Sequence, residues 1–203
     1  MSAIGRASGW RQHWRRLRPL YLVALLCLLP VVASYLADYA FPPTGRTNYG
    51  ELIEPQRPTP ALELHRLDGA PFDLKALRGT WVMLTVDRAA CADDCQAKLW
   101  NMRQVRTATG KERERIERVF LIIDAEPTTT MLLREFEGTH FVRGSAAELE
   151  RFLALPSDGR AALDDCVWLI DPLGNLMLRW PPAADPSRMK KDMDRLLRAS
   201  RIG

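Results

Sequence analysis

Two cysteines, Cys91 and Cys95, are the residues of this chain whose type and spacing best suit chemistry. They are separated by Ala-Asp-Asp, they follow the apolar run 80–86, and they precede a predicted helix over 96–108. A helix N-terminus lowers the pKa of a nearby thiol, and the end of a strand holds a cysteine pair at the surface. The pair therefore suits thiol–disulfide exchange, with Cys91 as the attacking and Cys95 as the resolving thiol, or binding of a soft ion such as Cu(I). A disulfide that only staples the strand to the helix is the third interpretation.

Elements that could position this pair alternate along residues 60–203, which are long enough for one domain with its own core. Ser145 and Glu148 predict a capping box, and Asp185 with Pro186 predicts the start of the last helix. A short helix after Pro127 is expected to turn Met131, Leu132 and Phe136 inward. The predicted strands are 61–64, 80–86, 119–123, 141–142, 167–170 and 176–178, and the predicted helices are 96–108, one after Pro127, 145–155 and one from Pro186. This order predicts an α/β fold of the thioredoxin-like class.

The N-terminal part reads as a membrane anchor. Residues 1–18 hold five arginines and no acidic residue, and residues 19–37 carry no charge. Nineteen helical residues span about 28 Å, close to the ~30 Å thickness of a bilayer core. We predict a cytoplasmic basic flank over 1–18, a transmembrane helix over 19–37, and an extended Pro-rich tether over 38–59. A cleaved signal peptide is the alternative, and both place the following domain outside the cytoplasm.

Charge argues against a nucleic-acid partner. The chain has 29 basic and 25 acidic residues, a net charge of +4. Without the five N-terminal arginines the counts are 24 and 25, so the basic balance belongs to the flank of the anchor. Of the other two cysteines, Cys27 lies within the apolar anchor and Cys166 within an apolar strand, and both are predicted to be structural.

From about residue 62 to residue 197 the chain resembles the Sco/SenC family, membrane-anchored thioredoxin-fold proteins that assist assembly of the copper site of cytochrome c oxidase. Cys91 and Cys95 have the family's Cys-x-x-x-Cys spacing, and Asp93 stands where the family often has an aspartate. The other segments that carry the resemblance are 67–69 with 77–80, 119–126, and the late hairpin Trp-Leu-Ile-Asp-Pro-Leu-Gly at 168–174.

The chain departs from this family beside the cysteine pair and at a position that binds copper. Ala92 and Gln96 replace prolines that usually follow the cysteines, and Leu163 stands at or near the position of the family's copper-binding histidine. No histidine lies between His140 and the C-terminus. We interpret His140 and His65 as structural. Two thiolates suffice for weak Cu(I) binding, whereas Cu(II) prefers an added imidazole.

The short, simple leader favours a bacterial inner-membrane protein with one anchor, a cytoplasmic N-terminus and a periplasmic domain, and a mitochondrial source is the alternative that an Arg-rich, acid-free N-terminus also suits. The resemblance implies that the partner is a cytochrome c oxidase subunit or another oxidase assembly factor, and that the cargo is copper, held by Cys91 and Cys95. A general periplasmic thiol–disulfide oxidoreductase of the cytochrome-maturation type is an alternative, although Ala90 replaces the tryptophan expected before the first cysteine. A degenerate module that only binds other proteins is a further alternative. A peroxiredoxin is disfavoured because Arg88 stands where a threonine or serine is required.

Overall fold

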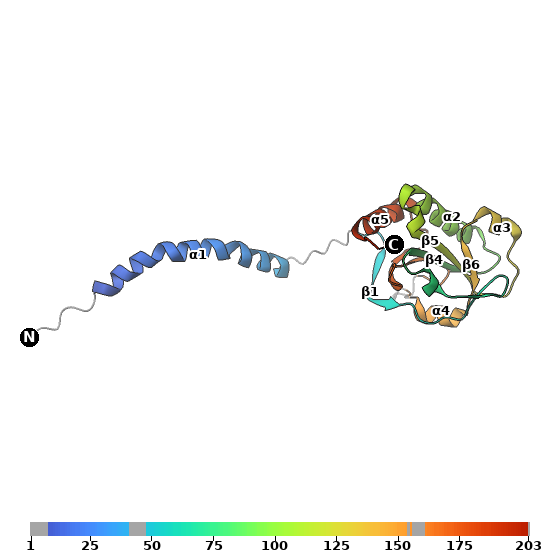
Figure 1. Ribbon diagram of the computed structural model, residues 1–203, viewed down its shortest axis with the longest axis horizontal. Coiled ribbons are helices and arrows are strands. Elements are labelled where there is room, and N and C mark those ends of the chain that lie inside the picture. Colours follow the sequence, from blue (N-terminus) through green and yellow to red (C-terminus); the bar gives the residue numbers. More distant parts are fainter. Residues whose placement is uncertain (1–7, 41–47, 154, 156–160, 203) are drawn as a thin grey trace, which may run out of the picture. The chain divides into compact units, whose positions relative to one another are not determined.

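The structure is a computed structural model that describes residues 8–40, 48–153, 155 and 161–202. It divides into two units, residues 1–47 and 48–203, each described by itself below. The first contains one helix, α1 (Ser8–Ala40), whose segment Pro19–Leu36 is long and apolar enough to cross a bilayer (Figure 1). Large apolar side chains along this segment are exposed, as they would be towards lipid. The predicted candidate membrane span is thus present as a helix.

The second unit is built on one mixed sheet of eight strands, in the order β1-β8-β7-β4-β5-β6-β2-β3. Its centre is parallel, because β4 pairs in parallel with β5 and β5 with β6. The remaining pairs are antiparallel, and β7 and β8 form the predicted hairpin. The strands are β1 (Glu51–Pro58), β2 (Leu64–Arg66), β3 (Pro71–Phe72), β4 (Trp81–Asp87), β5 (Ile116–Ile122), β6 (His140–Arg143), β7 (Val167–Ile170) and β8 (Asn175–Trp180).

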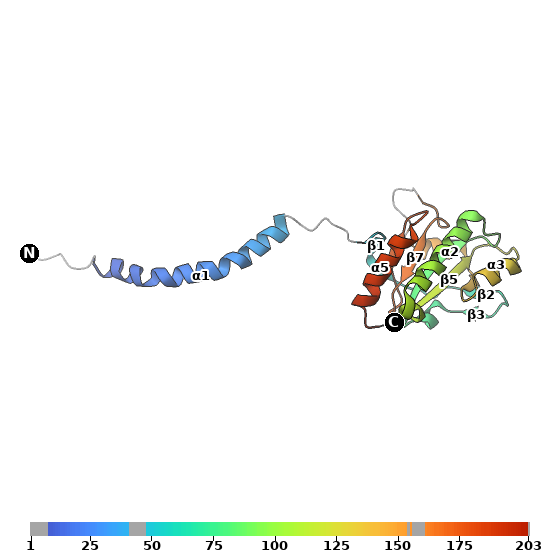
Figure 2. The ribbon, with the colours of Figure 1, turned by 90° about the horizontal axis from the view of Figure 1, so that it is seen from above.

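Helices cover both faces of this sheet (Figures 1 and 2). One face carries α2 (Asp93–Ala108), α3 (Thr130–Glu135) and α5 (Pro186–Ala199), and the other carries α4 (Ala146–Phe152). Two short 3-10 helices, η1 (Leu74–Leu77) and η2 (Gly110–Arg115), join neighbouring elements. Alternate residues of β5 face opposite ways: Val119 and Leu121 pack in the cluster under α4, whereas Phe120 and Ile122 pack under α2 and α3.

The start of the domain corrects the predicted tether. Residues 51–58 are not a free linker: they form β1, which adds to the sheet edge beside β8. Pro55 and Pro58 fit there because an edge strand has one side without ladder hydrogen bonds, and the register shifts between Leu52 and Arg57. The buried carboxylate of Asp192 anchors this entry by accepting hydrogen bonds from the backbone N–H groups at 49 and 50, at 3.0 and 2.8 Å. The tether residues 41–47 lie outside the described residues.

The structure confirms some of the predicted helix caps and inward side chains and contradicts others. Asp185 caps α5 as predicted, because its side chain accepts from the backbone N–H of Ser187 at 2.8 Å. The predicted capping box is absent. Ser145 makes no side-chain cap, and Glu148 instead accepts a hydrogen bond from the backbone N–H of Glu63. Met131, predicted to turn inward, points to solvent and is 78% exposed, whereas Leu132 and the C-cap residue Phe136 are buried as predicted.

Candidate functional site

Cys91 and Cys95 form a disulfide at the junction of β4 and α2, with Cα atoms 5.1 Å apart. The bond joins the two cysteines that the sequence singled out, for which a disulfide was one of three interpretations. Helix α2 begins at Asp93, before the second cysteine, so Cys95 lies in its first turn. Cys91 lies in the short connection after β4, where its backbone N–H donates to the carbonyl of Arg88 at 3.1 Å. The two sulfurs therefore come from the loop and the helix that the strand-to-helix pattern places side by side.

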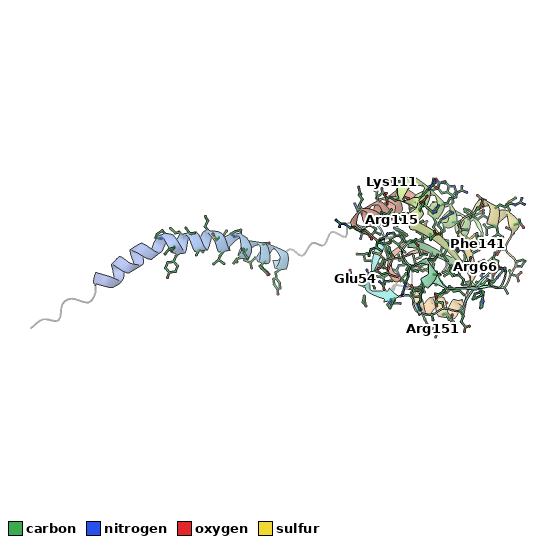
Figure 3. All side chains as sticks on the ribbon, in the orientation of Figure 1. Glu54, Arg66, Lys111, Arg115, Phe141 and Arg151 are labelled. Carbon is green, nitrogen blue, oxygen red and sulfur yellow. A yellow bond between two sulfur atoms is a disulfide. The ribbon has the colours of Figure 1, made fainter. Side chains whose placement is uncertain are left out.

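The predicted surface position of the pair is wrong. Both cysteines are only 1% exposed, and they belong to an apolar cluster at one end of α2. The cover comes from a neighbouring helix, since Leu132 of α3 and its C-cap residue Phe136 belong to this cluster. Phe141, labelled in Figure 3, is partly buried against it and meets Phe120 edge to face at 5.5 Å between ring centroids. A partner thiolate can reach the disulfide only when this cover opens.

The backbone at Cys91 is strained. Its φ is +41°, in the left-handed region that residues with a side chain avoid. Gln96 helps to hold this conformation, because its side-chain amide donates to the carbonyl of Cys91 at 3.0 Å. Strain of this kind costs of order 1–3 kcal/mol and concentrates at functional sites. Cys91 therefore combines a reactive group with an unfavourable backbone conformation.

The electrostatics at the start of α2 oppose one another. The helix N-terminus favours a thiolate, and no side chain caps it. Asp93 and Asp94 lie in the same first turn, where their negative charge offsets the helix dipole. For a freed Cys95 thiol, the helix N-terminus therefore favours the thiolate and the two aspartates disfavour it.

An ion pair that the sequence analysis missed lies one turn further along. Lys98 is 8% exposed, and its Nζ atom donates to Oδ2 of Asp87 at 2.9 Å and to the backbone carbonyl of Asp164. It thereby joins the end of β4, the cysteine helix and the segment that precedes β7. The only signal in the sequence was the spacing: Lys98 follows Cys95 by three residues, which places both on the inward helix face.

The ligands available do not fit a three-ligand copper site. Leu163 is 7% exposed and packs, with Cys166, in the core cluster that includes α4, whereas the cysteine pair packs under α2 and α3. Burial raises the pKa of Cys166 to about 11, so this thiol stays protonated. Within the described residues, no three His, Cys, Asp or Glu side chains gather as metal ligands.

Neither histidine of the described domain approaches the pair. His140 begins β6, opposite Val119, and its Nε2 lies 3.2 Å from Oε2 of Glu117. That position is level with Leu84, in the middle of β4, and two strands away, so about 10 Å separates it sideways from β4. His65 lies one strand further out, on β2.

Comparison with known proteins places the chain in a family. Residues 81–200 match the family model described as "Transmembrane-like, thioredoxin-like, C-terminal domain". The chain belongs to this family. Its match begins with β4 and ends just after α5, so it contains the disulfide and both helical layers. The predicted thioredoxin-like fold is confirmed.

The relatives agree with this assignment. A Stutzerimonas stutzeri protein named "Putative copper-binding protein" is 31% identical over 124 residues, which cover 59% of this chain and 56% of the relative. Yeast Sco1 with copper bound superposes with a TM-score of 0.56 at 17% identity, covering 73% of this chain and 96% of that one. BsSco, described with a disulfide switch and as a member of the Sco family of cytochrome c oxidase assembly proteins, gives 0.52 at 13% identity over 72% and 96%. The fold of this family member is thus the fold of Sco proteins, as the resemblance implied.

Proposed function

We propose that this protein is a membrane-anchored, extracytoplasmic thiol–disulfide exchange protein that assists cytochrome c oxidase biogenesis. Cys91 and Cys95 are the proposed catalytic residues. One observation carries the proposal: a disulfide at the β4–α2 junction whose first cysteine has a φ of +41°. A purely structural bond needs no strained residue, whereas a bond that must break and re-form gains from one that relaxes when it opens.

The exchange runs in two steps. A thiolate of a partner dithiol attacks one sulfur of Cys91–Cys95, which forms a mixed disulfide and releases the other cysteine as a thiolate. The second partner thiolate then displaces the remaining cysteine. The partner leaves oxidised, and Cys91 and Cys95 gain the two electrons and two protons that the partner dithiol gives up. In the opposite direction the Cys91 thiolate attacks a partner disulfide and Cys95 resolves the mixed bond.

The proposed topology follows from charge and compartment. The arginine-rich segment 1–18 stays in the cytoplasm by the positive-inside rule, α1 crosses the bacterial inner membrane, and the domain lies in the periplasm. Disulfides persist in that compartment, which agrees with the Cys91–Cys95 bond. The proposed partner is a cytochrome c oxidase subunit or another oxidase assembly factor, and its support is the likeness of fold to BsSco.

Weak handling of Cu(I) as cargo is a second candidate, favoured by the name of the Stutzerimonas stutzeri relative. Reduced Cys91 and Cys95 offer two soft ligands, which suffice for two-coordinate Cu(I) only. An anaerobic Cu(I) titration of the reduced protein against a competing chelator tests this candidate, with Cys91→Ser/Cys95→Ser as control. One-to-one binding that the control loses supports copper transfer, whereas binding no stronger than that of the control excludes it.

Trapping of the mixed disulfide tests the exchange proposal directly. In Cys95→Ser the Cys91 thiolate can attack a partner disulfide and release one partner thiolate, but no resolving thiol is present. Cys91 should therefore remain joined to its partner, and the adduct should separate under reductant. The same cells report the consequence: Cys91→Ala/Cys95→Ala should lower the amount of assembled oxidase, whereas Cys27→Ala, which removes a thiol in α1, should not. Absence of an adduct together with normal oxidase in the double variant would refute the proposal and favour a module that only binds other proteins. Adducts with many unrelated periplasmic proteins would favour a general oxidoreductase.

A further inference from the structure

A groove opens beside the disulfide, on the face of α2 that turns towards α5. Its volume is about 210 Å³. It starts at Asp94, the residue before Cys95, and extends along α2 to Asn101. The opposite wall is formed by the segment before β7 and by the segment between β8 and α5, which Asn101 holds through a hydrogen bond to the carbonyl of Ala184 at 3.1 Å. Neither cysteine lines the groove, but Asp94 brings one end of it to within one residue of Cys95.

The rim of the groove is acidic. Three carboxylates line it, those of Asp94, Asp164 and Asp165, and the first and last of these residues are exposed. Within the described part of the chain, none of the three forms an ion pair with a cationic side chain. Among the described residues that line the groove, Lys98 alone is cationic, and its charge is already matched by Asp87 at 2.9 Å. The groove thus carries a negative charge that a bound cation would balance.

The floor of the groove is apolar. Val167 and Met189 line it and are 3% and 0% exposed. Pockets that bind small organic ligands usually measure about 300–1,000 Å³, so this groove is too small for a typical cofactor and matches a single long side chain. An apolar floor below an acidic rim suits lysine or arginine, whose methylene stem packs on apolar surface while the charged group stays at the edge.

We infer that this groove binds a basic side chain located near the target cysteine of a partner polypeptide. The inference rests on the proposed thiol exchange and adds what the partner must carry. The basic residue seats the partner segment, so that its cysteine lies over Cys91–Cys95 when the α3 cover opens. Asp94 and Asp164 are the specificity-determining residues, and they contribute charge to recognition rather than to bond exchange.

Synthetic single-cysteine peptides test this with the full chain in detergent. Each peptide carries arginine, or its uncharged analogue citrulline, at successive positions on either side of the cysteine. The readout is the ratio of the rates at which the two peptides form a mixed disulfide with the protein, divided by the same ratio for a small soluble disulfide. This division removes the effect of arginine on the peptide's own thiol. The ratio also cancels any change that a variant makes in the reactivity of Cys91 and Cys95. At the best position we expect arginine to react about fivefold faster, as one or two partly exposed ion pairs allow, and we expect salt to abolish the difference.

Variants locate the effect. The ratio should move towards one in Asp164→Asn and in Asp94→Asn/Asp164→Asn. Both variants keep the backbone carbonyl of residue 164 that Lys98 contacts. Glu150→Gln, which removes an exposed charge from α4 on the other face of the sheet, should leave the ratio unchanged. If the peptides exchange measurably but the ratio is near one at every position in the unaltered protein, the groove does not bind a basic side chain. The exchange proposal then still stands. If no peptide exchanges, binding of the same peptides with serine in place of cysteine is measured. Binding that depends on arginine and on Asp164 supports the groove as a site for a basic side chain without the exchange proposal. No such binding overturns both the groove and the exchange proposal.

Discussion

Reduction of the Cys91–Cys95 disulfide should change the stability of the domain only slightly. The bond closes a loop with a sequence separation of 4, and chain entropy assigns such a small loop about 2 kcal/mol of stabilisation. Against this stands the left-handed backbone of Cys91, at φ +41°, which costs about 1–2 kcal/mol and can relax once the bond is open. The difference leaves the oxidised form more stable by less than about 1 kcal/mol.

Urea titration of the full chain in detergent, with and without reductant, measures this difference. Tryptophan fluorescence follows unfolding of the domain, because Trp168 and Trp180 are both fully buried. Cys91→Ala/Cys95→Ala serves as control, since reductant should not shift its curve. A stabilisation of about 2 kcal/mol or more would mean that no strain is released on opening. The bond would then behave as a staple, and the argument from the Cys91 backbone would fail.

Three further substitutions test the surroundings of the site. Leu163→His should cost about 2–4 kcal/mol of stability without raising Cu(I) affinity, because this side chain is buried in the cluster that includes α4; thermal unfolding and chelator competition measure the two effects. Cys166→Val should flatten the alkaline loss of stability. Burial raises the pKa of Cys166 from 9.0 to about 11, so the unfolded chain releases a proton that the folded protein retains, and urea midpoints of the unaltered protein should fall between pH 9 and 11. Arg118→Met should raise the free energy of unfolding by about 1 kcal/mol in a urea titration. Burial and then two neighbouring arginines lower the pKa of Arg118 to about 10, and within the described residues its Nε and Nη1 have no hydrogen-bond partner.

The sequence predicted the fold where local signals agree with packing. The apolar run of β5, the turn residues of the β7–β8 hairpin and the Asp185 cap all act within a few residues, and all appear as predicted. The β1 strand escaped prediction because its prolines indicate a linker, and only pairing with β8 makes it a strand. Pairing between residues that far apart in sequence leaves no local pattern.

The candidate site shows the same division. Type and spacing alone identified Cys91 and Cys95, and they left thiol exchange, Cu(I) binding and a disulfide staple open. Their burial depends on α3, a helix some forty residues further on whose packing the pattern of 130–135 does not disclose. The contact of Lys98 with Asp164 likewise joins positions separated by 66 residues. Chemistry that lies within one short motif can be predicted from sequence, whereas access to it is decided by the tertiary structure.

The absent copper ligand bears on which chemistry the cysteine pair performs. Leu163 stands at or near the position of the family's copper-binding histidine and packs in the apolar core, so no imidazole adds to the metal affinity of Cys91 and Cys95. The ammonium group of Lys98 is paired with Asp87 at 2.9 Å, so it adds little net charge near the thiols. Two thiolates alone bind Cu(I) weakly, whereas thiol–disulfide exchange needs only the two sulfurs. The residues present therefore favour a site that exchanges electrons over one that retains a metal ion.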